Sequence, residues 1–136
     1  MKIVIDTNVL VSGLRSKRGN AYRLVSMIPS DKFTMVLSVP LLLEYEEVLN
    51  RPGLLPAFKS PQIEKFLDLL CKFSVHQEIH FIWRPFLKDP NDDLVAEVAF
   101  ASGSKQIITF NVKDFKGVDS LGISVSTPKQ FLLKYR

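Results

Sequence analysis

Acidic and amide side chains occur at three places along the chain where they could bind a metal ion. They are Asp6, Asp92, Asp93, Asn111 and Asp114. The first follows a β-branched run at residues 2–5, and the last two follow another such run at 106–110. Because ligands of open parallel sheets bind beyond the carboxyl ends of the strands, we expect these oxygen atoms to converge at one edge.

Carboxylates that converge in this way repel one another, and without a cation one or more would stay protonated near neutral pH. A donor set made only of oxygen suits Mg²⁺ or Mn²⁺. Zinc chemistry is not indicated, since His76 and His80 have i, i+4 spacing but no third ligand nearby. Cys71 falls on the apolar face of a predicted helix and is expected to belong to the core.

Each acid also has a purely structural explanation. Asp6 could form a turn or cap a helix, and Asp89, Asp92 and Asp93 could satisfy free N–H groups at a helix start.

A further candidate acid lies on the predicted helix at 40–49. Its apolar stripe is centred on Leu41, Tyr45 and Leu49, so Glu47 faces away while Glu44 and Glu46 flank the stripe. Periodicity alone leaves both Glu44 and Glu46 open.

To bring these residues to one edge of a sheet, the chain must alternate between strands and helices. Strands are predicted at 2–5, 33–38, 106–110 and 123–125, with an ambiguous edge strand at 78–83; helices are predicted at 20–27, 40–49, 60–72, 92–102 and 127–134. Such alternation predicts an α/β fold, a three-layer α/β/α arrangement around a mainly parallel sheet, in a single domain spanning residues 1–136.

Composition narrows the class of protein. The chain of 136 residues is 46% hydrophobic and 24% charged, which is typical of a globular domain. No apolar run approaches the roughly 18 residues of a membrane span, and Asp6 interrupts what would be the apolar part of a secretory signal. With a single cysteine, we expect a cytoplasmic protein. The net charge of +4 is compatible with a nucleic-acid partner, and Arg15, Lys17, Arg18 and Arg23 form a segment without acids.

Four motifs in order resemble the PIN-domain family, most closely the short prokaryotic toxin-type (VapC-like) PIN proteins of type II toxin–antitoxin systems. They are Ile3-Val4-Ile5-Asp6-Thr7-Asn8-Val9-Leu10, Ser38-Val39-Pro40-Leu41-Leu42-Leu43-Glu44, Asp89-Pro90-Asn91-Asp92-Asp93, and Ile107-Ile108-Thr109-Phe110-Asn111-Val112-Lys113-Asp114-Phe115. The resemblance covers nearly the whole chain.

The resemblance implies a ribonuclease that depends on Mg²⁺ or Mn²⁺. By position Asp6, Glu44 and Asp92 match the three principal acids, with Asp93 one residue away as an alternative to Asp92. At the fourth site the family often has an acid where this chain has Asn111, and Asp114 is the nearest acid.

Supporting roles follow from the same resemblance. Asn8 and Thr109 would be polar supports for the acids. Independently of the resemblance, if RNA is the substrate, we expect the cations Arg15, Lys17, Arg18 and Lys113 to contact its backbone. A homodimer and a cognate antitoxin are the expected protein partners. The alternative hypothesis is a catalytically weak PIN-fold module that binds RNA or protein, and Asn111 is the feature in its favour.

Overall fold

The computed structural model describes residues 1–80 and 87–134. Five parallel strands form one sheet in the order β3-β2-β1-β4-β5. The strands are β1 (Lys2–Ile5), β2 (Thr34–Leu37), β3 (Val75–His76), β4 (Gln106–Ile108) and β5 (Ser124–Ser126). The helices are α1 (Thr7–Arg15), α2 (Asn20–Ser26), α3 (Val39–Leu49), α4 (Ser60–Lys72), α5 (Pro90–Ser102) and α6 (Pro128–Lys134), with 3-10 turns η1 (Val112–Phe115) and η2 (Val118–Leu121).

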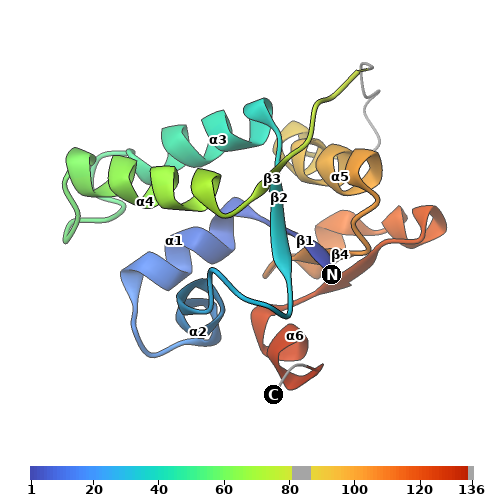
Figure 1. The fold of residues 1–136 in the computed structure, drawn as a ribbon, viewed down its shortest axis with the longest axis horizontal. Helices are drawn as coiled ribbons and strands as arrows, with labels where there is room; N and C mark the ends of the chain where they lie inside the picture. Colours follow the sequence, from blue (N-terminus) through green and yellow to red (C-terminus); the bar gives the residue numbers. More distant parts are fainter. Residues whose placement is uncertain (81–86, 135–136) are drawn as a thin grey trace.

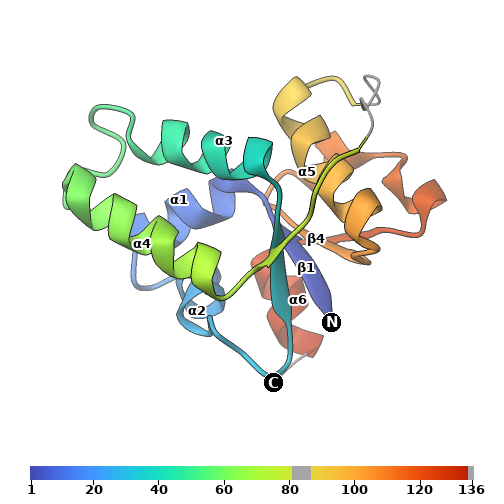
Figure 2. The same ribbon diagram turned by 45° about the horizontal axis from the view of Figure 1, so that its top comes forward.

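Helices cover both faces of the sheet. Helix α5 packs on β1, β2 and β4, whereas α1 to α4 lie on the other side (Figures 1 and 2). Helix α6 follows the edge strand β5 and packs against α2. The predicted three-layer α/β/α fold is therefore confirmed.

The central strands supply the core. Ile3, Val4 and Ile5 of β1 are fully buried, as are Ile107 and Ile108 of β4. Continuous burial is expected of strands that have helices on both faces. It holds β1 and β4 side by side, and their carboxyl ends carry the first and fourth acidic motifs.

Helix α1 differs from the sequence prediction, which has no helix at residues 7–15. Valines and Gly13 give this segment a weak intrinsic helix preference. Packing explains the helix: a Cβ at Gly13 would lie 3.0 Å from the side chain of Val25 and 3.2 Å from the carbonyl oxygen of Ala21. Glycine therefore allows α1 and α2 to approach closely.

The edge strand also differs. The prediction at 78–83 is wrong for residues 78–80, which form no strand, and residues 81–83 lie outside the described part of the chain. Strand β3 lies upstream at Val75–His76, where the backbone pairs with Val36 and Leu37 of β2. Apolar periodicity could not locate it, because both of its residues are exposed.

Candidate functional site

Asp6 lies at the junction of β1 and α1. Its backbone N–H donates to the carbonyl of Ile108 at 2.9 Å, which fixes the end of β1 against β4. One side-chain oxygen accepts from the N–H of Thr7 at 2.8 Å and caps α1. Asp6 is 8% exposed, and burial raises the pKa of its carboxyl despite these hydrogen bonds.

The second oxygen of Asp6 is held from β4. The hydroxyl of Thr109, which is fully buried, donates to Oδ2 at 2.7 Å. The amide of Asn8 reaches the Thr109 hydroxyl at 3.5 Å, and the N–H of Asn111 donates to the same hydroxyl at 3.0 Å. Thr109 therefore links Asp6 to the turn that carries Asn111.

The two adjacent acids of α5 face different surroundings. Asp93 is buried and its Oδ1 accepts from the N–H of Leu87 at 2.9 Å, so it holds the segment before the helix. Asp92 is only partly buried and lines the same groove as Asp6. Desolvation, followed by the charges of Asp6, Asp89 and other acids, raises the pKa of Asp92 to about 7.

Helix α3 presents Glu44 rather than Glu46 to this groove. Glu44 is partly buried and lines the groove, whereas Glu46 is exposed. Burial raises the pKa of Glu44, and the neighbouring charges of Glu47 and Asp6 act in the same direction. The alternative that periodicity left open is thus decided by how α3 packs beside α1.

These residues line one groove of about 610 Å³. Its walls come from α1 and α3, and its acidic part is formed by Asp6, Glu44 and Asp92. Asn111, from the turn after β4, lines it too. Acids from three distant stretches are therefore brought to one cavity by the parallel sheet.

Asp114 lies in an adjoining hollow. It is exposed on η1 and lines that hollow together with Asp92, Lys113 and Lys116. Its charge contributes to the raised pKa values of Asp6 and Asp92. Asp114 is thus an electrostatic neighbour of the acidic groove without lining it.

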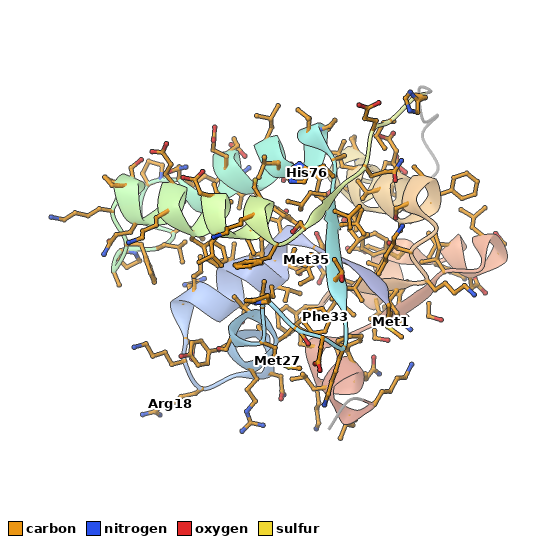
Figure 3. All side chains as sticks on the ribbon, in the orientation of Figure 1. Met1, Arg18, Met27, Phe33, Met35 and His76 are labelled. Carbon is orange, nitrogen blue, oxygen red and sulfur yellow. The ribbon has the colours of Figure 1, made fainter. Side chains whose placement is uncertain are left out.

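The predicted RNA-contacting cations separate into two groups. Arg15 lines the acidic groove and Lys113 lines the adjoining hollow. Lys17 and Arg18 are exposed in the loop after α1 and line neither. In Figure 3, Arg18 lies at the far end of α1 from the helix start that Asp6 caps.

Arg51 also lines the groove and is not among the sequence-predicted residues. Its Nη2 forms a salt bridge with Oε2 of Glu47 at 2.9 Å, and its positive charge acts to lower the pKa of Glu44. Arg51 lies just beyond the end of α3 at Leu49, and its spacing four residues after Glu47 is the signal that could have found it.

The acids fit a hydrated divalent cation better than a fully protein-bound one. Within residues 1–80 and 87–134, no three carboxylate, imidazole or thiol side chains form a ready-made ligand cluster. Mg²⁺ keeps several of its waters and uses one or two carboxylates, so it does not need such a cluster. The donors are all oxygen, and the pKa of Asp92 is raised first by desolvation and then by the neighbouring acidic charges, which a bound cation would offset.

The fold of this chain is similar to that of known proteins. Twelve chains of solved structures match the fold. One of them belongs to the crystal structure of VapBC2 from Rickettsia felis bound to a DNA fragment from their promoter, with a TM-score of 0.62 and 18% identity, covering 92% of this chain and 98% of that one. No curated protein matches in sequence. In the described part of the chain, no helix is long and apolar enough to cross a membrane. The family described as PIN domain matches residues 2–113, which is most of the sequence, and the chain therefore belongs to the PIN-domain family.

Proposed function

We propose that this protein is an endoribonuclease that depends on Mg²⁺ or Mn²⁺ and hydrolyses RNA phosphodiester bonds as the toxin of a toxin–antitoxin pair. The observation that carries this proposal is the single groove in which Asp6, Glu44 and Asp92 meet, with Arg15 and Arg51 in the same walls. Acids that hold a cation, next to arginines that bind phosphate, are the elements a phosphodiester nuclease needs.

Each residue has a distinct task in this proposal. Asp6 and Asp92 would hold the ion, with Asn111 as a neutral oxygen ligand. Thr109 keeps the Asp6 carboxylate oriented through its 2.7 Å hydrogen bond. A divalent ion bound here would lower the pKa of a coordinated water and polarise the phosphoryl oxygen. Glu44, whose pKa is raised, is suited either to join the ligands or to accept a proton from water.

The cations bind the RNA backbone in this proposal. Arg15 and Arg51 would contact phosphates inside the groove, and Lys113 would contact them at the adjoining hollow. Lys17 and Arg18 would act beyond the groove. The similar VapBC2 chain supports an antitoxin as partner. A homodimer and a cytoplasmic location complete the proposal.

Cleavage of single-stranded RNA with Mn²⁺ tests the assignment. Asp6→Asn should abolish cleavage while the fold persists, because asparagine can still accept the α1 capping bond. Asp31→Asn is the matched control, since Asp31 is exposed and precedes β2 at the opposite end of the sheet. Full cleavage by the wild type in EDTA would contradict the metal assignment.

Asn111 supports the alternative function, a PIN-fold module that binds RNA or protein and cuts weakly. An amide can coordinate Mg²⁺, but it lacks the charge that would help to hold a second ion. Calorimetric titration with Mn²⁺ separates the two functions. Saturable binding that Asp6→Asn removes supports the nuclease, and the absence of saturable binding by the wild type supports the module.

A further inference from the structure

A second groove, of about 600 Å³, lies between α2 and α6, outside the acidic site. Helix α2 contributes polar, aromatic and basic side chains to it, and α6 contributes a lysine and two leucines. Its walls are formed by Asn20, Tyr22, Arg23, Ser26, Met27, Lys129, Leu132 and Leu133. No acid lines it.

The positive charge of this groove is uncompensated. Within the described residues, neither Arg23 nor Lys129 has a carboxylate within salt-bridge distance. The chain carries no acid between Thr7 and Ser30, so no neighbour in sequence offsets Arg23. Unpaired cations around a cavity provide a favourable place for phosphate groups.

An aromatic ring lies beside these cations. Tyr22 is 36% exposed and lines the groove next to Arg23. Exposed aromatic rings with adjacent cations bind single-stranded nucleic acid, because bases stack on the ring while the cations bind the backbone. Exposed Leu133 adds apolar surface. The aromatic ring together with uniformly positive charge favours RNA over a protein segment.

Along the chain, basic side chains occur between the residues of the acidic groove and those of this one. Arg15 lines the acidic groove at the end of α1, Lys17 and Arg18 follow in the loop, and Arg23 lies on α2. Figure 3 shows Arg18 at this end of the molecule, where the chain passes from α1 to α2.

We propose that the groove between α2 and α6 is a second binding site for single-stranded RNA, which holds nucleotides flanking the cleavage site. Tyr22 stacks on a base, and Arg23 and Lys129 bind phosphates. This inference rests on the proposed ribonuclease function, which it deepens by naming a site that makes the enzyme prefer longer substrates.

Binding measured in EDTA tests this site without requiring cleavage. The probes are fluorescent single-stranded RNAs of about 4 and about 12 nucleotides, a range covered by known single-strand binding sites. The test variant is Arg23→Gln with Lys129→Gln. Its control is Lys65→Gln with Lys105→Gln, which removes the same charge from exposed positions elsewhere.

The expected loss is confined to the longer RNA. The test variant should bind it about tenfold more weakly, with a salt slope smaller by about 1.4, which corresponds to two lost phosphate contacts. Tyr22→Leu should also weaken binding about tenfold, and Tyr22→Phe should retain it because the ring remains.

Three results would overturn the proposal. The first is equal binding of the longer RNA by the wild type and the test variant, and the second is an equal loss of RNA binding in the control variant. The third is that the test variant keeps its RNA binding but no longer binds an acidic Leu/Glu-rich peptide, which would identify a protein-docking groove. Failure of the nuclease proposal is separate, because it would abolish Mn²⁺-dependent cleavage of both RNAs while leaving this binding difference in place.

Discussion

Replacing Asp92 by asparagine removes the acid whose charge is least well tolerated in the metal-free groove. Its pKa is raised from 3.8 to about 7, first by desolvation and then by the charges of nearby acids. The folded state therefore binds this proton more tightly than the unfolded state does. Between about pH 4 and pH 7 stability falls as pH rises, and the full penalty is present above pH 7.

The size of the effect follows from two opposing contributions. Each tenfold change in proton affinity is worth about 1.4 kcal/mol, and screening by water at this partly exposed carboxyl reduces the total penalty to about 1–2 kcal/mol. Asp92 also lies in the first turn of α5, where a negative charge is favourable by about 0.3–1 kcal/mol. We therefore expect Asp92→Asn to stabilise the metal-free protein by about 1 kcal/mol at pH 8.

Urea unfolding followed by circular dichroism in EDTA measures this gain. The midpoint of Asp92→Asn should exceed that of the wild type at pH 8, with an unchanged slope, and most of the difference should be gone at pH 4. Saturating Mn²⁺ should reverse the order, because the ion stabilises the form that binds it. Asp31→Asn, at the opposite end of the sheet, should show neither effect. A gain that is independent of pH, or a loss at pH 8, would refute the electrostatic reasoning.

Three further substitutions test the support of the site. Thr109→Val removes the buried donor to Asp6, and we expect Mn²⁺ affinity measured by calorimetry to fall about tenfold. Tyr45→Phe removes the buried hydroxyl that donates to the carbonyl of Ile5, and urea unfolding should show a loss of about 1–2 kcal/mol. Asn111→Asp adds a fourth acid to the groove, so Mn²⁺ titration should show tighter binding, whereas thermal unfolding in EDTA should occur at a lower temperature. If the Mn²⁺ affinity and the unfolding temperature were both unchanged, residue 111 would not lie near the ion.

Local sequence pattern was enough to predict much of this fold. The continuous β-branched runs of β1 and β4 and the amphipathic repeat of α4 were predictable, because burial leaves a pattern of apolar residues that is visible along the chain. The edge of the sheet at which a ligand is expected to bind followed from the same alternation, since the carboxyl ends of parallel strands lie at one edge. The resemblance to the PIN-domain family, stated from four motifs, is confirmed by the match to residues 2–113.

Other features depend on contacts between distant residues. Helix α1 packs closely on α2 at Gly13, where a Cβ would crowd Val25 and Ala21, and no local preference records such an approach. Asp92 and Asp93 are adjacent in sequence, and only the 2.9 Å bond from Leu87 to Asp93 shows which carboxylate is used structurally.

The sequence by itself determined the parallel α/β architecture and the oxygen-rich character of the site, because both depend on residue types and their spacing. The tertiary structure decided that Glu44 rather than Glu46 enters the groove, that Arg51 joins it, and that Asp114 stays in the adjoining hollow. The physical reason is that helix rotation and groove walls are set by packing between elements far apart in the chain. That packing depends on side-chain volumes summed over many contacts rather than on any one segment.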